Sequence, residues 1–395
     1  MHRRTALFGI GGGLLLGGSP LGLFSSSSAL AAGQRPKPEK KSLIIGMDPT
    51  ICATPIIMAQ QLGLFKKYGF ENITIVRSGS PPLMAEQLQS GAFDLAQQFM
   101  PIPLLQATTA KPNDDIPVMI SNLGGNGAAL VMSLKRANSK DPKTWRGFRI
   151  GVPSLQSYHA LMFRYLIAEH GLDPDIDVTL RVVSQNEVSA QLRGGLIDGH
   201  FGSEPAGQLA VFEDVGFIHT LSRDIWPGHS CCALTAYAGW IRRNPNTFSA
   251  AVRAVVEATA YAAAPQNRAE VVATISKHEY LDLPEAVADQ LLVGPFADGL
   301  GKTAVVADRT LFDSYPNATF AIWTLTQLKR WGILRGDIKY ADVVRRAILE
   351  SEIRNDMTQL GITSPAAAPS STVMGRSFDP SKPDDYIAQF RIRRQ

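Results

Sequence analysis

The 395-residue sequence has few cysteines and no acidic residue at its start. Its three cysteines, Cys52, Cys231 and Cys232, exclude a disulfide framework and a four-cysteine zinc site. Beyond the first 32 residues, no segment is apolar enough to span a membrane. Only 19% of residues are charged and the formal net charge is +4, which is too little positive charge to indicate a nucleic-acid-binding protein. With 45% hydrophobic residues, the chain can bury large cores, and its length suits two lobes.

Common catalytic motifs are also missing from the sequence. There is no nucleophile elbow, no His-Glu-x-x-His, no P-loop and no Gly-x-Gly-x-x-Gly after a predicted strand. We therefore expect a protein that is not an enzyme and that carries no cofactor and no metal ion.

The first 32 residues have the pattern of an export signal peptide. Arg3 and Arg4 precede an apolar, glycine-rich run, and small residues then lead to a predicted cleavage after Ala31 or Ala32. The paired arginines resemble a twin-arginine signal, while Sec export stays open because Ala6 stands where that pattern usually has Phe. We expect a periplasmic mature protein that is not embedded in a membrane.

The sequence repeats itself at an offset of about 104 residues. The pattern Gln-Leu-x-x-Gly-x-x-Asp occurs at 87–94 and again at 191–198. Ile-Gly occurs at 45–46 and at 150–151, and two helix-ending glycines, Gly69 and Gly171, follow in the same order. Three matches in one order favour a duplicated structural unit.

Each copy predicts strands that alternate with helices. In the first copy we expect strands over 42–47 and 73–77 and helices over 54–67 and 83–89; in the second, strands over 148–152 and 178–183 and helices over 159–169 and 187–192. Such units form mainly parallel sheets flanked by helices, and these sheets bind ligands beyond the carboxyl ends of their strands. The prediction is an α/β fold of two lobes with a ligand cleft between them.

Several segments resemble the periplasmic nitrate- and bicarbonate-binding proteins of ABC importers, within the wider nitrate/sulfonate/taurine class. They are Ala53–Gln60 with Gly63–Phe70, the strand and following loop over 94–103, Gly202–Pro205, Trp226–His229, and Phe378–Tyr386. The resemblance spans about residue 43 to the end of the sequence. It implies a type II periplasmic-binding-protein fold in which the second lobe is inserted into the first.

The resemblance also implies a division into lobe 1 over 43–130 and 236–363 and lobe 2 over 131–235. From composition we expect a signal peptide over 1–32, a polar, Pro-containing linker over 33–42, and a C-terminal tail over 364–395 that begins with a Pro/Ser/Ala-rich stretch. The expected function is capture of a small anion (nitrate, bicarbonate or a sulfonate) for the permease subunits of an ABC importer, by a monomer that binds no nucleic acid. The alternatives are a ligand sensor without transport and an enzyme resembling a thiamin-precursor synthase.

Candidate ligand-binding residues of the first lobe follow predicted strands or open helices. Ser78 and Ser80 lie in a Ser-Gly-Ser turn that could approach a ligand or be an ordinary turn. Gln97 follows Asp94 at the carboxyl end of a strand, where a buried amide needs a partner. Asn126 falls where the family has a polar contact, and turn chemistry is the alternative.

The candidates of the second lobe include one histidine, one acid and one cysteine. His159 matches a family histidine at a helix start, with Gln156 and Ser157 as weaker companions. Glu204 could orient a donor or accept from a protonated ligand, or it could belong to a structural ion pair. Cys232 stands beside Cys231 where family members often have a lysine. The favoured alternative is that both are small buried hydrophobic side chains, and whether Cys52 pairs with either of them stays open.

Overall fold

The computed structural model describes residues 36–111, 113–363 and 372–394. The predicted signal peptide, residues 33–35 of the predicted linker, residue 112 of the predicted lobe 1 and residues 364–371 and 395 of the predicted tail lie outside the described residues. None of the helices in the described part of the chain combines the length and the hydrophobicity that a bilayer span needs.

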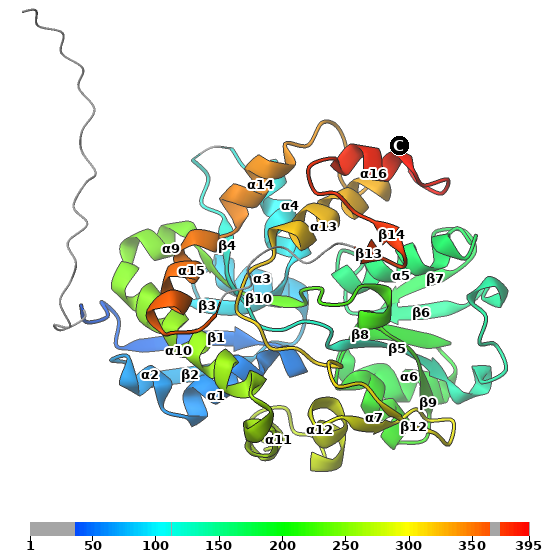
Figure 1. The fold of residues 1–395 in the computed structure, drawn as a ribbon, viewed down its shortest axis with the longest axis horizontal. Helices are drawn as coiled ribbons and strands as arrows, with labels where there is room; N and C mark the ends of the chain where they lie inside the picture. The colour runs from blue at the N-terminus through cyan, green and yellow to red at the C-terminus, as the bar shows by residue number, and fades with distance from the viewer. Residues whose placement is uncertain (1–35, 112, 364–371, 395) are drawn as a thin grey trace, which may run out of the picture. The chain divides into compact units, whose positions relative to one another are not determined.

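Two five-stranded sheets form the framework of the segment Lys37–Gln395 (Figure 1). Sheet I has the order β2-β1-β3-β10-β4, and sheet II has the order β7-β6-β8-β5-β9. The strands of sheet I are β1 (Ser42–Met47), β2 (Asn72–Arg77), β3 (Leu95–Phe99), β4 (Pro117–Asn122) and β10 (Cys232–Tyr237). Those of sheet II are β5 (Ala128–Ser133), β6 (Arg149–Val152), β7 (Thr179–Val182), β8 (Gly199–Ser203) and β9 (Gly216–Leu221).

The two sheets share one topology, which confirms the duplication. In each sheet the first strand of the copy (β1 or β6) lies between two strands that run parallel to it. The third strand of the copy (β3 or β8) then pairs antiparallel with a strand that enters from the other half of the chain (β10 or β5). The repeated aspartates make the same hydrogen bond in both copies. Asp94 Oδ2 accepts from the backbone N–H of Ile44 at 3.0 Å, and Asp198 Oδ2 accepts from that of Arg149 at 2.8 Å.

Helix packing follows the duplication as well. The helices are α1 (Thr54–Gln61), α2 (Leu64–Lys67), α3 (Pro81–Gln89), α4 (Pro101–Thr109), α5 (Tyr158–Glu169), α6 (Val188–Gly194), α7 (Ala206–Phe212), α8 (Ser222–Ile225), α9 (Ala238–Arg243), α10 (Pro245–Ala263), α11 (Arg268–Ile275), α12 (Glu285–Leu292), α13 (Ala318–Arg330), α14 (Tyr340–Ala347), α15 (Glu350–Gln359) and α16 (Pro383–Ala388). Leu88 of α3 and Leu192 of α6, which are equivalent in the repeat, each belong to a small cluster on their own sheet. A larger apolar core joins residues of both sheets.

Two local predictions need correction. The helix expected over 54–67 is divided into α1 and α2, because Gly63 adopts a left-handed conformation with φ of +67°. The loop expected after the strand at 94–99 is instead helix α4, whose first turn accommodates Pro101 because the missing N–H is not needed there.

The chain passes between the sheets through adjacent crossing segments. Residues 123–127 lead from β4 to β5, and residues 222–231 lead back from β9 to β10. Gly125 forms isolated bridges with both Ser230 and Leu311, so a third segment lies beside these two. A Cβ atom on Gly125 would lie 2.5 Å from the carbonyl oxygen of His229, so only glycine fits this close approach.

We predict that Gly125→Ala lowers the free energy of unfolding by roughly 1–3 kcal/mol, as overpacking against backbone does. The matched control is Gly79→Ala, whose Cβ would make an ordinary contact of 3.7 Å with Leu83. Urea unfolding of both variants measures the difference. Equal stability of the two variants would contradict the close approach.

Candidate functional site

The ends of both sheets meet at a buried boundary, which we call the inter-sheet seam. It comprises the chain that follows β1, the end of β3, the start of α5, the end of β8 and the crossing segment 222–231. The backbone N–H of Ile51 donates to the carbonyl oxygen of Glu204 at 2.8 Å, which joins the two halves directly. The rings of Phe99 and His159 meet edge to face across the seam, with centroids 5.2 Å apart.

On the side of sheet I, Gln97 and Thr50 form a buried polar pair. The Gln97 amide nitrogen donates to the Thr50 hydroxyl at 2.9 Å, and both side chains are at most 1% exposed. Gln97 Oε1 has no hydrogen-bond partner among the described residues. Because a hydroxyl can donate or accept, the amide can present either its oxygen or its nitrogen to a ligand.

On the side of sheet II, His159 pairs with Ser203. His159 Nε2 lies 3.0 Å from the Ser203 hydroxyl, while Nδ1 has no partner among the described residues. Burial lowers the pKa of His159 to about 3, so the imidazole is neutral at physiological pH. If Nε2 accepts from Ser203, Nδ1–H is a free donor in the seam.

Three sulfur atoms occupy the centre of the seam. Cys52 Sγ lies 2.7 Å from Cys231 Sγ, which lies 3.5 Å from Cys232 Sγ and 2.9 Å from the Tyr158 hydroxyl. Burial raises the pKa of the Cys231 thiol, but hydrogen bonds from Cys232 and Cys52 lower it, and the net direction is downward. Burial raises the pKa of Cys232.

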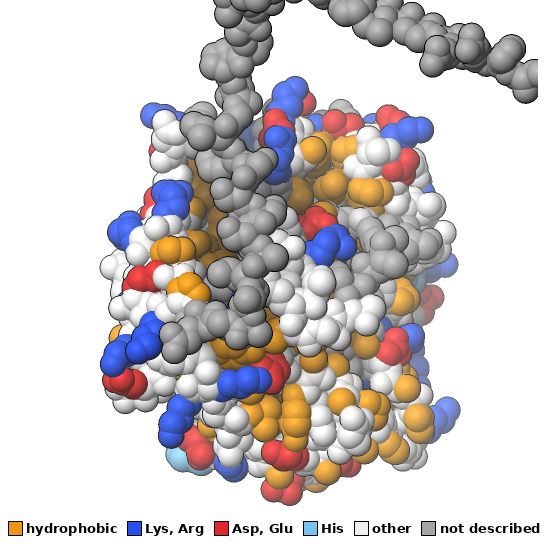
Figure 2. All heavy atoms as spheres, turned by 60° about the vertical axis from the view of Figure 1, so that its left-hand side comes forward, with side chains coloured by type: hydrophobic (Ala, Val, Ile, Leu, Met, Phe, Trp, Pro, Cys, Tyr) orange, Lys and Arg blue, Asp and Glu red, His pale blue; other side chains and the backbone are white. Residues whose placement is uncertain are grey.

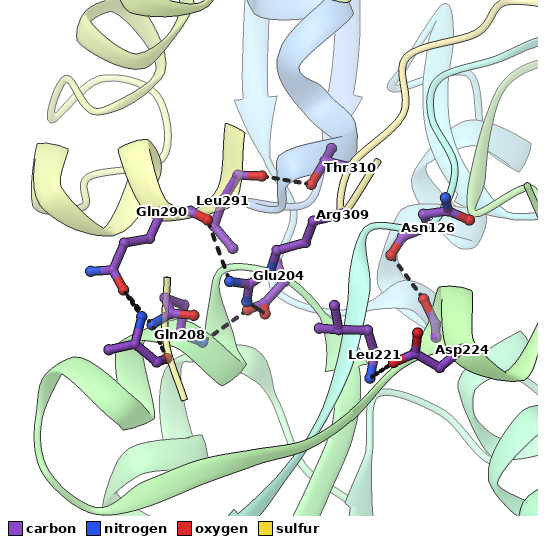
Figure 3. Close-up of polar contacts among 11 residues, drawn as sticks. Asn126, Glu204, Gln208, Leu221, Asp224, Gln290, Leu291, Arg309 and Thr310 are labelled. Atoms are coloured by element: carbon purple, nitrogen blue, oxygen red, sulfur yellow. Dashed lines mark hydrogen bonds and ion pairs between the residues drawn. The ribbon is translucent and has the colours of Figure 1, made fainter. Parts of the chain in front are cut away.

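Glu204 belongs to a buried ion pair. Its carboxylate accepts from Arg309 at 2.6 Å and from the backbone N–H of Gln208 at 2.9 Å, and Glu204 and Arg309 are 1% and 2% exposed (Figure 3). The Arg309 guanidinium also lies over the Phe296 ring, 4.0 Å from its centroid. This arrangement is that of a structural pair, the alternative that the sequence left open.

The remaining predicted residues cap helices, make turn contacts or hold segments together. Ser78 donates to the carbonyl of Ser80, and the Ser80 hydroxyl caps α3. Asn126 has a left-handed conformation, as in a turn, but its side chain accepts from Gly228 N–H and donates to the carbonyl of Asp308, 102 and 182 residues away. Gln156 is exposed, whereas Ser157 is buried and caps α5. The structure thus brings together Gln97, His159 and Cys232, while Asn126 ties the crossing segments to each other.

Sequence reasoning missed four residues of this region: Asp48, Thr50, Ser203 and Arg309. Asp48 directly follows β1, and burial raises its pKa to about 7. Its position at the carboxyl end of a predicted parallel strand was a usable signal. Arg309 lies 105 residues from Glu204 in a segment without a motif, so no sequence signal pointed to it.

The chemistry of the seam is that of neutral hydrogen-bond donors and thiols. Its one nearby buried cation, among the described contacts, is Arg309, which Glu204 already neutralises. Outside the seam, the face drawn in Figure 2 carries Lys and Arg side chains interspersed with Asp and Glu, so that face shows no surface of one charge. The arrangement offers hydrogen-bond donors and acceptors, and no catalytic triad occurs among the residues described here.

The two matching sheets and the seam between them define the fold of the periplasmic binding proteins. The structure aligns with the periplasmic nitrate-binding protein NrtA from Synechocystis PCC 6803 with a TM-score of 0.85, over 90% of this chain and 100% of that one, at 22% identity. The chain belongs to the NMT1-like family, which residues 36–276 match.

Two relatives agree in sequence over most of this chain. The nitrate/nitrite binding protein NrtA of Nostoc sp. is 28% identical over 92% of this chain and 89% of its own length. The bicarbonate transport ATP-binding protein CmpC of Synechocystis sp. is 27% identical over 90% of this chain, which corresponds to 56% of that longer protein.

We predict that Arg309→Met lowers the free energy of unfolding by roughly 3–5 kcal/mol, because it leaves the Glu204 carboxylate buried without a counter-charge. The double variant Glu204→Gln/Arg309→Met should recover much of this loss. Urea unfolding at neutral pH measures both. A double variant as unstable as the single one would show that charge burial is not the cause.

Asp48 predicts a pH dependence of stability. A carboxyl group whose pKa is about 7 in the folded state and 3.8 in the unfolded state binds its proton more tightly when the protein is folded. Its contribution to the free energy of unfolding is therefore fully present below pH 3.8 and is lost as the pH rises toward 7. Asp48→Asn should therefore stabilise the protein at pH 8, by roughly 1–3 kcal/mol given partial exposure of the side chain, and have little effect at pH 4. Unfolding curves at the two pH values test this. An equal effect at both pH values would contradict it.

Proposed function

We propose that this protein is the solute-binding component of an ABC importer and that it captures a small anion of the nitrate, bicarbonate or sulfonate class. The solute binds at the inter-sheet seam, and movement about the crossing segments closes the two halves over it. The division into lobe 1 (43–130 and 236–363) and lobe 2 (131–235) is part of this proposal. So are export by the N-terminal signal, periplasmic location, a monomeric state and delivery to permease subunits.

One observation carries the proposal: the seam holds buried polar groups that lack partners, and they come from both halves. Gln97 Oε1 belongs to sheet I and His159 Nδ1 to the helix that opens the second copy. Buried polar groups are rarely left unpaired, so a ligand that supplies the missing bonds is the simplest explanation. Because the two halves contribute one group each, the ligand would bridge them.

The donors in this proposal are neutral, which distinguishes it from an anion site built on lysine. Neutral N–H and O–H groups stabilise an anion in a water-poor site because their dipoles are already oriented. Bicarbonate can both donate and accept, so the Gln97 oxygen suits it, whereas nitrate only accepts and requires the amide nitrogen. The names of the relatives, which mention nitrate, nitrite and bicarbonate, support this ligand class.

The test is a thermal-shift screen of the purified protein with nitrate, nitrite, bicarbonate, cyanate, taurine and alkanesulfonates. A true ligand at 100 times its Kd should add about 2.7 kcal/mol to stability. We expect at least one anion to do so. Stabilisation by a neutral solute alone would overturn the ligand class.

Two variants then test the position of the site. Gln97→Leu and His159→Phe remove hydrogen-bonding groups while they keep much of the buried volume, and each should weaken binding of the stabilising anion about five-fold or more. Gln89→Ala, an exposed position at the end of α3, is the matched control and should bind as the natural protein does. Unchanged affinity in both seam variants would show that the ligand binds elsewhere.

A further inference from the structure

All three cysteines of the chain gather at one point of the seam, although they are distant in sequence. Cys52 lies in the short 3-10 helix Ile51–Ala53, Cys231 ends the crossing segment and Cys232 begins β10. Their sulfur atoms all lie within 4.8 Å of one another, and the three residues are at most 2% exposed. Cys231 and Cys232 are adjacent in sequence, whereas Cys52 is 179 residues from Cys231.

The sulfur atoms lie close enough together to share one metal ion after a small adjustment. Thiolates bound to one ion at about 2.3 Å lie roughly 3.8–4.0 Å apart, whereas Cys231 Sγ lies 3.5 Å from Cys232 Sγ and 2.7 Å from Cys52 Sγ. Rotation about the Cα–Cβ bond of Cys52 would have to lengthen the shorter separation before all three sulfurs could bind one ion.

The surroundings of the sulfurs are those of a metal site. The Tyr158 hydroxyl lies 2.9 Å from Cys231 Sγ, and the Ser203 hydroxyl lies 3.7 Å from it, so two O–H groups can stabilise the thiolate from outside the metal's own ligands. The ring centroids of His159 and His229 lie 3.8 and 5.5 Å from that of Tyr158. His159 Nδ1 and His229 Nε2 are buried and lack partners among the described residues.

We propose that Cys52, Cys231 and Cys232 form a buried site for one soft, thiophilic metal ion, for which copper(I) is the probe. A set of three sulfur ligands favours a soft ion over Mg²⁺, Ca²⁺ or Mn²⁺, which prefer oxygen. Bound there, the ion ties the chain after β1 to the crossing segment. The proposal is argued from the thiols and not from the proposed solute, although the sulfurs lie at the same seam as the groups to which that solute is assigned.

The experiment titrates the reduced full-length mature protein with copper(I) under anaerobic conditions, in competition with the chelator bicinchoninate. We expect one equivalent to be withdrawn from the chelator and ultraviolet sulfur-to-copper charge-transfer absorption to appear. Cys52→Ser and Cys232→Ser should each weaken copper binding at least ten-fold, and the triple Cys→Ser variant should leave the chelator complex unchanged. Met58→Leu, which changes a buried sulfur outside the cluster, is the matched control and should bind as the natural protein does.

Two results would overturn the proposal. One is equal copper binding by the natural protein and the folded triple variant. The other is a disulfide between Cys52 and Cys231 that forms in air and resists a thiol reductant. Mass spectrometry would detect it as the loss of two hydrogen atoms. If the triple variant does not fold, alkylation decides: copper(I) should protect all three thiols of the natural protein from iodoacetamide in mild denaturant, and unprotected thiols would contradict the site.

Discussion

The close approach of the crossing segments at Gly125 is the constraint on which the arrangement of the two sheets depends. At this point the chain between β4 and β5 lies against the returning segment and against Leu311. A side chain there would collide with the backbone of His229. Since backbone meets backbone here, the crossing segments hold a fixed spacing at this point, and the apolar core that joins both sheets adds to it.

The electrostatic character of the seam follows from its burial between the two sheets. Burial removes charge from the imidazole of His159, and Glu204 neutralises the one buried guanidinium nearby. What remains is a set of hydrogen-bonding groups: the Gln97 amide, the hydroxyls of Thr50, Ser203 and Tyr158, the imidazoles of His159 and His229, and three cysteine sulfurs. Under the proposed function, such a set would recognise a solute by the geometry of its hydrogen bonds more than by its charge. This differs from the lysine that the resemblance to nitrate- and bicarbonate-binding proteins implies near Cys231.

Much of the fold could be predicted because the residues that recur in the sequence repeat have the same structural role in each copy. Asp94 and Asp198 stand at equivalent positions because each accepts from the first strand of its copy, and Leu88 and Leu192 recur because each fills the space between a helix and its sheet. The break in the helix at Gly63 escaped prediction because apolar periodicity continues across it. Glycine in a helical pattern is tolerated, and only the backbone conformation reveals the break.

The site was less predictable, for a physical reason. Gln97 and His159 could be found because both lie near the ends of predicted strands or helices. Thr50, Ser203 and Arg309 could not, because their importance comes from partners 47, 44 and 105 residues away. Local sequence does not encode such contacts, which arise only when the two sheets meet.

Hydrogen–deuterium exchange of residues 48–54, with and without the anion that stabilises the protein most, tests the central claim most directly. The Ile51 amide in this segment bonds to Glu204 across the seam, so a solute that bridges the halves should slow its exchange markedly. Exchange in this segment that stays unchanged while the protein as a whole is stabilised would contradict the account.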